Sequence, residues 1–413
     1  MPWMECDRMS LREEFVLLAT ADDRNVAELC RRFGISRKTG YKWLSRYNAD
    51  GRSGRGDRSR RPHHCPDQTP PNVQRAVLKL RHQHPTWGGR KLRARLLALG
   101  HSGVPGVPGV PSASTITAIL HRHDLIDPAE SLKREPMRRF ERPRPNDLWQ
   151  MDFKGDFALG NRRRCHPLTV LDDHSRYSIG LRSCSNQRYE TVREELTAMF
   201  RIHGLPREML MDNGTPWGVS HGIGGGYTRL AAWLLRLEVR VTHGRPYHPQ
   251  TQGKEERFHR TLKEELLREQ WFEDHDHAQR GFDPWRRIYN YERPHEALGM
   301  NVPAHRYRPS DRRMPQVLAE LEYESGVESR LVSPVGQVRF KGKVLKVSEA
   351  FAGGRIGLRE TMVYDVFELL WGRYTVGKAD LRQASGRRAA SVRLRSLRSL
   401  HRPDAETETD GKL

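Results

Sequence analysis

The chain has 413 residues, which is long enough for several domains, each with a core of its own. Lys and Arg outnumber Asp and Glu by 72 to 51, giving a net charge of +21, so nucleic acid is the first partner to consider and a basic but otherwise ordinary soluble enzyme is the alternative. Apolar runs such as 15–19 are far shorter than the ~18 residues of a membrane span, and we expect a soluble protein with no membrane partner.

The five cysteines are scattered along the chain without a Cys-x-x-Cys pair. An odd number without paired spacing argues against a disulfide framework and favours a reducing compartment. His63, His64 and Cys65 stand together, but no second ligand pair follows at the spacing of a zinc site. We therefore interpret this stretch as part of a polar linker.

The first 50 residues predict a helix-turn-helix DNA-binding domain. Helices are expected over 10–20 and 25–33, and a third begins after Ser36, whose hydroxyl suits an N-cap. The turn before Ser36 joins two helices as in a helix-turn-helix, although any three-helix bundle could use it. The basic side chains predicted to bind DNA from the third helix are Arg37, Lys38 and Lys42.

A second helical unit is predicted over 71–127, between two basic linkers at 51–70 and 128–145. Its expected helices are 73–84, 89–99 and 112–123, as in another helix-turn-helix or a winged unit. The repeat GVPGVPGVP interrupts it at 103–111, where Pro at every third position excludes a helix and predicts an extended loop.

The region 146–300 has α/β patterning and is predicted to form a mixed sheet with helices on its faces. The expected strands are 148–153, 165–172, 177–183, 207–212 and 238–242, and the expected helices are 189–203, 227–237 and one that begins at Gly253.

Alternating patterns past 300 predict a C-terminal β-rich domain over 301–385, which we interpret as a small β-barrel. Its expected strands are 336–348, 355–360 and 363–381. The end of the chain, 386–413, has six Arg before a short acidic stretch and little apolar content, so we expect a charged tail without fixed structure.

Three acids stand where an α/β core would present them together. Asp152 lies near the end of the first strand, Asp212 ends a later strand before an Asn-Gly turn, and Glu256 lies in the first turn of a helix. Carboxylates in such places can converge on two hard divalent cations, as in phosphoryl-transfer sites. Each acid alone is weak evidence for a metal site, and the three together are stronger evidence. Asp172 and Asp173 are rival carboxylates, for which turn formation and pairing with Arg are preferred to metal binding.

The stretches LWQMDF, LDDHSR, MDNG, YHPQTQGKEERFHRTLKEEL and YNYERPHEALGMNVPAHRY resemble bacterial insertion-sequence transposases, whose catalytic core is related to retroviral integrase. The resemblance covers nearly the whole chain and implies an RNase H-like fold. It implies a catalytic and metal-binding triad of two Asp and one Glu, with two Mg²⁺ or Mn²⁺ ions. Carried over onto this sequence, the triad is Asp152, Asp212 and Glu256.

The resemblance also implies the activity and the partners. Such a DDE transposase binds the terminal inverted repeats of a mobile element, cleaves a DNA strand there with water and joins the freed 3′-hydroxyl to target DNA. Its partners would be double-stranded DNA of both kinds and further copies of itself, in the cytoplasm at the bacterial nucleoid. An inactive DNA-binding regulator and an RNase H-like nuclease are the alternatives. The chain departs from the family pattern in the surplus of residues between Asp212 and Glu256, which the Gly-rich stretch 217–227 accounts for.

Two adjacent glutamates compete for the third position of the triad. On a helix, Phe258, Leu262 and Leu266 form an apolar stripe, and Glu255 projects within it. Glu256 projects away from that stripe, on the side of the predicted DNA-binding residues Arg260 and Lys263. This grouping favours Glu256 as the metal ligand and leaves Glu255 as a tolerated charge near the helix start, with the reverse assignment still open.

Two further features are interpreted structurally. Trp149, Trp233 and Trp285 are expected in the core, because large aromatic side chains usually fill protein interiors. The Arg-Pro-His stretch at 293–295 matches the family, but its residues alone predict no more than helix termination and packing.

Overall fold

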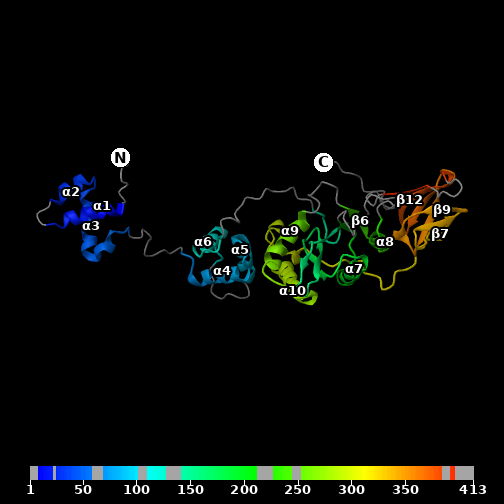
Figure 1. The fold of residues 1–413 in the computed structure, drawn as a ribbon, viewed down its shortest axis with the longest axis horizontal. Helices are drawn as coiled ribbons and strands as arrows, with labels where there is room; N and C mark the ends of the chain where they lie inside the picture. The colour runs from blue at the N-terminus through cyan, green and yellow to red at the C-terminus, as the bar shows by residue number, and fades with distance from the viewer. Residues whose placement is uncertain are drawn as a thin grey trace. The chain divides into compact units, whose positions relative to one another are not determined.

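The computed structural model describes most of the chain. The described residues are 8–21, 25–57, 68–100, 109–126, 141–211, 227–243, 253–383 and 391–395. They belong to two compact units, 1–68 and 69–413, and each unit is considered by itself (Figure 1). The two predicted linkers, the Pro-rich repeat and the stretch 217–227 lie largely or wholly outside the described residues.

The first unit is a small helical domain. Its elements are α1 (Arg8–Ala19), α2 (Val26–Arg32), α3 (Arg37–Asp50) and the short 3₁₀ helix η1 (Gly51–Arg55). Ser36 caps α3 as predicted, because its hydroxyl accepts a hydrogen bond from the Thr39 amide at 3.1 Å. Phe15 and Trp43 fill the core. Gly40 lets the helices approach closely, since a Cβ there would lie 2.4 Å from Cys30 Sγ.

The second unit begins with three more helices, α4 (Pro71–Gln83), α5 (Gly89–Leu99) and α6 (Ala113–Arg122). Ser112 caps α6 by accepting from the Thr115 amide at 3.1 Å, again as predicted. A separate apolar cluster holds these helices together around the fully buried Trp87. Two hydrogen bonds tie the helices to the following domain, from Arg95 to Glu292 and from Thr86 to Glu265.

The central domain is built on a mixed β-sheet. Its strands are β1 (Trp149–Phe153), β2 (Phe157–Ala158), β3 (Arg164–Asp172), β4 (Ser178–Cys184), β5 (Glu208–Met211) and β6 (Arg240–His243). β1 pairs antiparallel with β3 and parallel with β5, β3 pairs with β4, and β5 pairs parallel with β6. Every predicted strand of this domain is present within two residues of its expected bounds, and β2 is an addition.

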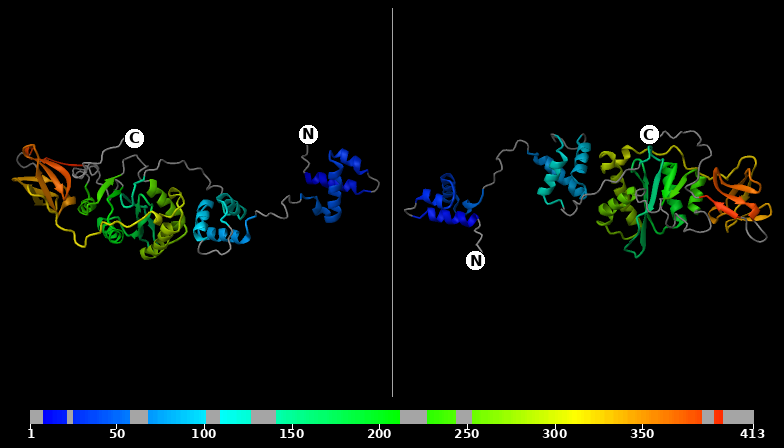
Figure 2. Two further views of the ribbon diagram at one scale, coloured as in Figure 1. Left: turned by 180° about the vertical axis from the view of Figure 1, so that it is seen from behind. Right: turned by 90° about the horizontal axis from the view of Figure 1, so that it is seen from above.

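Helices cover both faces of this sheet (Figures 1 and 2). The helices α7 (Tyr189–His203) and α8 (Arg229–Arg236) pack with β1 and β5 in one apolar cluster. The helices α9 (Gly253–Leu262) and α10 (His275–Tyr291), joined by the π-helical turn η4 (Lys263–Leu267), form a second cluster with β3 and β4. The sequence analysis did not identify α10. Trp149, Trp233 and Trp285 are buried as expected.

The C-terminal domain is β-rich, but the prediction of a closed barrel is not confirmed. Its strands are β7 (Val327–Leu331), β8 (Gln337–Phe340), β9 (Lys343–Lys346), β10 (Arg355–Glu360), β11 (Val366–Trp371), β12 (Tyr374–Asp380) and β13 (Ser391–Leu394). Five of them form an open sheet in the order β13-β12-β11-β10-β7, and β8 and β9 form a separate hairpin. The predicted strands 336–348 and 363–381 are each two strands in the structure, and β7 was not predicted. Alternating patterns also do not tell whether the last strand bonds to the first.

The strand β13 also corrects the expectation for the tail. Residues 391–394 pair antiparallel with β12, although the stretch 386–402 was expected to lack structure. Dense positive charge lowered the apparent strand signal, yet an exposed edge can take charged residues on its solvent side. The rest of the tail lies outside the described residues.

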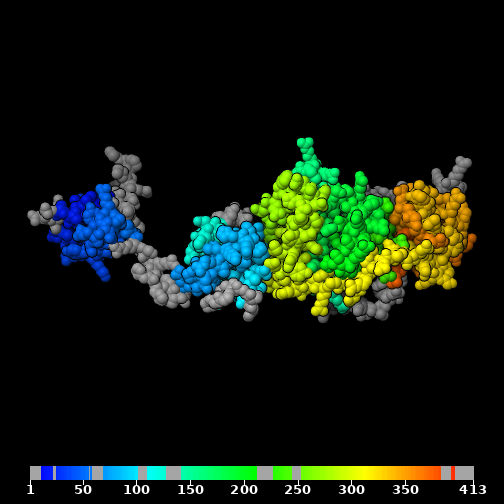
Figure 3. All heavy atoms as spheres, turned by 90° about the horizontal axis from the view of Figure 1, so that it is seen from below, coloured from blue at the N-terminus to red at the C-terminus, as the bar shows by residue number. Residues whose placement is uncertain are grey.

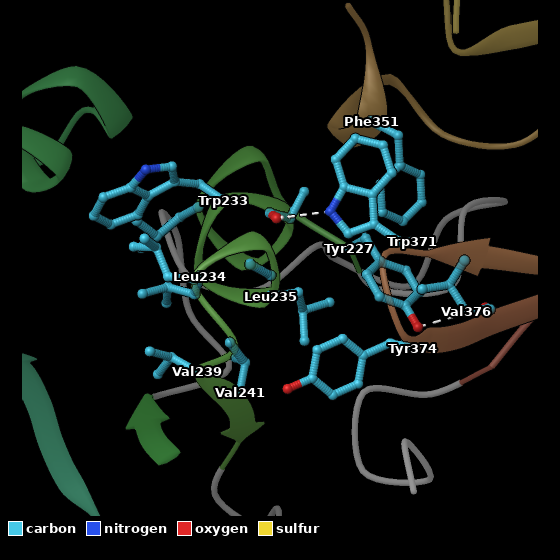
Figure 4. Packing of buried hydrophobic residues seen from close by; sticks show 14 of the residues in the cluster. Tyr227, Trp233, Leu234, Leu235, Val239, Val241, Phe351, Trp371, Tyr374 and Val376 are labelled. Atoms are coloured by element: carbon cyan, nitrogen blue, oxygen red, sulfur yellow. Dashed lines mark hydrogen bonds between the residues drawn. The ribbon is translucent and has the colours of Figure 1, made fainter. Parts of the chain in front are cut away.

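The C-terminal domain shares one apolar cluster with the central domain, and the space-filling view shows the two in contact (Figure 3). Figure 4 shows the junction, where Trp371 and Phe351 lie against α8. The Trp371 indole donates a hydrogen bond to the Ala232 carbonyl at 2.8 Å. A buried indole N–H with a partner inside the neighbouring domain fixes the two domains together. Among the described residues, no helix is long and apolar enough to cross a membrane.

Candidate active site

The strand β1 separates apolar from polar side chains by simple alternation. Trp149 and Met151 belong to the apolar cluster on the α7 and α8 side of the sheet. Gln150 and Asp152 therefore project toward the opposite face, which α9 covers. The Asp152 side chain retains 31% of its exposure, and its Oδ1 accepts a hydrogen bond from the Phe153 amide at 2.8 Å. A carboxylate fixed in this way and open to solvent can bind a cation.

Thr169 and His259 adjoin Asp152. Thr169 lies directly opposite Asp152 in the register of β1 and β3, and its hydroxyl donates to the Asp152 carbonyl oxygen at 2.9 Å. The His259 ring on α9 approaches the same hydroxyl, with 2.8 Å between Nε2 and Oγ1. His259 Nδ1 lies 3.9 Å from Asp152 Oδ2. Burial, together with the charge of Lys154, lowers the pKa of His259 to about 3, so the ring is neutral at pH 7.

Glu255 is the carboxyl group that α9 buries. It is 2% exposed, and its Oε2 lies 3.2 Å from the Thr169 hydroxyl and 3.6 Å from His259 Nε2. Its Oε1 has no hydrogen-bond partner among the described residues. Burial raises the pKa of Glu255 well above its ordinary value, and the neighbouring charge of Asp152 adds to this effect. Glu255 is therefore buried between α9 and the sheet, next to Asp152.

Glu256 is exposed on the other side of the same helical turn. The exposed side chains of Arg260 and Lys263 follow it along α9, while Phe258 is buried. The structure thus confirms how the helical pattern divides the two glutamates between the apolar stripe and the solvent. It corrects one part of that interpretation, because Glu255 was expected within the apolar stripe and instead has the polar partners Thr169 and His259 near Asp152.

Asp212 lies outside the described residues. The parallel pairing of β1 and β5 runs from Trp149 opposite Met209 to Met151 opposite Met211. Asp152 follows Met151 in the sequence, and Asp212 follows Met211, the last residue of β5.

The rival carboxylates Asp172 and Asp173 are fully buried and fully engaged. Asp172 accepts from the Ser175 amide and hydroxyl, which confirms the predicted role in a turn. Burial raises the pKa of Asp172, and these hydrogen bonds oppose that shift. Asp173 pairs with Lys254 of α9, whereas the nearby Arg176 pairs with Glu141. The prediction of an ion pair with Arg was therefore wrong about the cation.

The Arg-Pro-His stretch closes α10 and joins it to η4. Arg293 is 8% exposed, and its Nε donates to Glu265 at 2.9 Å. His295 packs edge-on against Tyr289, with 4.7 Å between ring centroids. The same Glu265 carboxylate accepts the Thr86 hydroxyl of the preceding helical domain at 3.0 Å. The motif therefore has a structural role in holding α10 and η4 together, as well as ending a helix.

Sequence reasoning missed Thr169, His259 and Lys254 as parts of this site. His259 follows Glu255 by four residues, a spacing that places both on one helix face and could have identified it. Lys254 has no comparable signal, because its partner Asp173 is far away in sequence. Thr169 is detectable only through the antiparallel register of β1 and β3.

The donor set around Asp152 suits a hard divalent cation, because its acids offer oxygen ligands. Among the described residues, no three potential ligands gather closely enough to form a metal site by themselves. Asp212, the second predicted carboxylate of the triad, is not among those residues. The residues present fit a carboxylate-bound Mg²⁺ or Mn²⁺, with Asp152 and a glutamate of α9 as the described part.

The predicted DNA-binding side chains are all on the surface. Arg37, Lys38 and Lys42 are exposed on α3, and Lys42 Nζ lies 4.6 Å from the centre of the Trp43 ring. The helix thus presents a basic face to solvent in the position that a helix-turn-helix uses.

Comparison with known protein families assigns most of these regions. The chain matches an integrase core domain over residues 142–249 and again over 237–303. It matches a helix-turn-helix domain over 11–63 and a homeodomain-like domain over 39–120. Residues 327–387 match the C-terminal domain of IS481 family transposases. The helix-turn-helix matches support DNA binding by the N-terminal part of the chain.

Known relatives include proteins of bacterial insertion elements. An uncharacterized protein of insertion element IS476 from Xanthomonas euvesicatoria is 32% identical over 160 residues, which are 39% of this chain and 44% of the relative. An uncharacterized protein of insertion element IS407 from Burkholderia multivorans is 30% identical over 39% of this chain and 54% of the relative. The chain thus spans about half the length of these relatives.

Among solved structures, the catalytic core of HTLV-2 integrase in complex with magnesium is 14% identical and covers 40% of this chain and 97% of that chain, with a TM-score of 0.30. A likeness of this size supports no conclusion about function. The family matches thus show an integrase core over 142–303 and, over 327–387, a domain that is found in IS481 family transposases.

Proposed function

We propose that the chain is an insertion-sequence transposase, which binds the terminal inverted repeats of its element and catalyses metal-dependent strand cleavage and strand transfer at a triad of Asp152, Asp212 and Glu256. The observation that carries the proposal is the close approach of α9 to Asp152 on β1, where His259 Nδ1 lies 3.9 Å from Asp152 Oδ2 and Glu255 lies beside the neighbouring Thr169 hydroxyl. The integrase core match over 142–249 supports it.

In the first reaction, water attacks a phosphodiester at the element's end and the 3′-oxygen leaves. In the second, the freed 3′-hydroxyl attacks a phosphodiester of target DNA and the target's own 3′-oxygen leaves. Two bound divalent ions would activate the attacking oxygen and stabilise the leaving one. The chain's part is to hold its carboxylates at fixed positions, and Asp152 is held by the Phe153 amide and by the neighbouring hydroxyl of Thr169.

Glu256 is the better candidate for the third ligand, because it is exposed on α9 and an incoming cation can reach it. Glu255 is enclosed between Thr169 and His259 and would have to leave these partners to reach solvent. Arg260 and Lys263 lie on the exposed side of the same helix and suit the phosphates of a bound DNA end. Glu255 then has a structural role, because it contacts Thr169 and His259 on the buried side of α9.

The N-terminal helices would supply end recognition. The basic face of α3 carries Arg37, Lys38 and Lys42 in the position of a recognition helix. Bringing two element ends together for joining calls for more than one copy of the chain, so we propose a homo-oligomer on DNA. This assembly would act in the bacterial cytoplasm, where the element's DNA lies.

The test uses full-length protein and an oligonucleotide duplex of one inverted repeat. Asp152→Asn and Asp212→Asn should each lose cleavage and joining with Mg²⁺ or Mn²⁺, because each removes one carboxylate oxygen ligand. Binding of the repeat should persist, since the helix-turn-helix domain is untouched. Efficient joining by either variant would overturn the triad.

The alternative functions make different predictions for a precleaved duplex that already has a free 3′-hydroxyl. A transposase joins this end to target DNA, whereas an RNase H-like nuclease only shortens it. An inactive regulator binds the repeat and leaves both substrates unchanged.

A further inference from the structure

A cluster of buried polar side chains lies beside the proposed site, and Asp173 is its centre. Asp173 follows β3 directly and is completely buried. Its two carboxylate oxygens accept from three donors that come from three different parts of the chain. A buried carboxylate is costly unless it is paired and hydrogen-bonded, so this arrangement is specific.

The first two donors fix Asp173 to the beginning of the domain. Gln150 Nε2 donates to Asp173 Oδ1 at 2.7 Å, and Gln150 stands two residues before Asp152 on β1. The backbone amide of Arg142 donates to Asp173 Oδ2 at 2.7 Å. The Asp173 amide in turn donates to the Leu148 carbonyl at 3.0 Å. Asp173 is therefore held rigidly against the strand that carries Asp152.

The third donor belongs to α9. Lys254 Nζ donates to Asp173 Oδ1 and lies 3.3 Å from the Asp173 carbonyl oxygen. The Lys254 side chain is only 15% exposed, so this ion pair is shielded from solvent and salt. Lys254 stands two residues before Glu256. The ion pair thus joins the turn that bears the proposed glutamate to a point fixed on β1.

A second contact holds the same helix about one turn later. His259 Nε2 lies 2.8 Å from the Thr169 hydroxyl, which donates to the carbonyl of Asp152. Glu256 lies between the contacts at Lys254 and His259. The two contacts together hold the first turn of α9 against β1 and β3.

We propose that Asp173 is a positioning residue for strand transfer, which through Lys254 fixes the first turn of α9, and with it Glu256, at the correct distance from Asp152. Asp173 itself touches neither DNA nor metal in this role. The inference rests on the proposed function only for its consequence for activity, because the anchoring of α9 by Asp173 can be measured without any reaction.

Substituting the anchor has a clear chemical effect. Asp173→Asn replaces two accepting oxygens by one oxygen and one NH₂ group, so at least one of the three donors then faces another donor. Lys254→Met keeps most of the side-chain volume and removes the charge and the donors. Lys254→Arg keeps the charge. The matched control is Asp172→Asn, which alters the neighbouring, equally buried carboxylate that bonds Ser175 and not α9.

The first measurement is hydrogen exchange of the metal-free, full-length protein, read by mass spectrometry on peptides that cover α9. Asp173→Asn and Lys254→Met should each speed exchange of the Arg257 to His259 amides about 10-fold, because these amides depend on the first turn being in place. Asp172→Asn and Lys254→Arg should leave them near the wild-type rate. Wild-type exchange in both anchor variants would overturn the proposal.

The second measurement is the Mn²⁺ concentration for half-saturation, followed by electron paramagnetic resonance, together with the joining rate on a precleaved end. The anchor variants should need about 10-fold more Mn²⁺ and should join at a rate 10- to 100-fold lower, the scale found when a residue behind a metal ligand is lost. Binding of the repeat should stay unchanged. In the double variant Asp173→Asn/Lys254→Met, the losses in joining rate and in Mn²⁺ affinity should be no larger than in either single variant, since each change breaks the same contact.

The outcomes separate the two proposals. If the wild type neither binds Mn²⁺ nor joins DNA, the proposed function fails, and the exchange experiment still decides whether Asp173 anchors α9. If the wild type is active and the anchor variants match its joining rate and half-saturation, Asp173 has no positioning role. If Asp173→Asn does not fold, Lys254→Met carries the same test at a less enclosed position.

Discussion

The two faces of the central sheet differ in what they bury. The face under α7 and α8 is apolar and continues without a break into the C-terminal domain through Trp371. The face under α9 also has an apolar cluster, but it buries Gln150, Glu255 and Asp173 as well. The single strand β1 contributes to both, because its alternate residues point to opposite sides.

The difference shows how the fold divides its tasks. Apolar packing is non-directional and tolerates small shifts, so the α7 and α8 face can provide stability. Buried polar groups are stable only when each donor meets an acceptor, so the α9 face fixes its helix at one position. Fixed positions are what a site for phosphoryl transfer needs. Variants on the two faces should therefore fail in different ways.

The largest effect is expected on the α9 face, at Glu256. Glu256→Gln should lower cleavage and joining about 10³-fold or more, as expected when a group that acts in the transition state is removed. The matched control is Glu255→Gln, whose amide can still accept from Thr169, and it should stay within about 10-fold of the wild type. Rates on a precleaved end, with repeat binding checked in parallel, measure both. A dead Glu255→Gln beside an active Glu256→Gln, both folded, would assign the ligand to Glu255.

The apolar face should respond through stability. Trp371→Ala removes a large buried side chain and its hydrogen bond to Ala232, and we expect a loss of about 3–5 kcal/mol in the free energy of unfolding. Joining per folded molecule should change little, because Trp371 contacts α8 and not α9. Urea unfolding measures the first quantity. Met362→Ala, at a fully exposed turn, is the control and should shift stability by less than about 0.5 kcal/mol. Equal effects of both variants would refute the shared core.

The sequence predicts the apolar face better than the polar one. Patterns of two and 3.6 residues find the strands and α7, whose bounds agree with the structure. They also separate Glu255 from Glu256, because Phe258 and Leu262 mark the buried side of the helix. These patterns involve residues that are close in the sequence, so they can be recognised without knowing which segments contact one another in the fold.

The polar contacts could not be predicted, since each joins residues that are distant in the chain. Lys254 finds Asp173 and His259 finds Thr169 only after β1, β3 and α9 have come together. The helix α10 was overlooked although it is long, because Pro284 and many charged residues interrupt its pattern. The open form of the C-terminal sheet was missed for a related reason, because closure depends on the contact of the first strand with the last.

A smaller effect concerns pH and the end of α7. Burial lowers the pKa of His203 to about 4, and the charge of Arg286 contributes. In the unfolded chain the His203 ring takes up a proton near pH 6.5, whereas in the folded chain it does so near pH 4. The contribution of the neutral ring to stability is therefore fully present above pH 6.5, and it is lost as the pH falls from 6.5 to 4. His203→Gln should reduce that loss by about 2–3 kcal/mol. The midpoints of urea unfolding of both proteins at pH 7 and pH 4.5 test this prediction. An equal loss of stability in the two proteins between these pH values would contradict it.

The smallest effect concerns DNA binding by exposed basic residues on the two sides of the central sheet. Lys263 is exposed on η4, directly after α9, and Arg201 is exposed on α7, on the other side of the sheet. If the DNA end lies along α9, Lys263→Ala removes one phosphate contact, weakens binding a few-fold at moderate salt and lowers the slope of log K against log salt by about 0.9. Arg201→Ala removes the same unit of charge and should change neither quantity. Fluorescence anisotropy with a labelled repeat at several salt concentrations measures both variants. Because the net charge of the two variants is equal, a difference between them locates the DNA on the α9 face, whereas equal weakening would mean that only the overall charge of the chain attracts it.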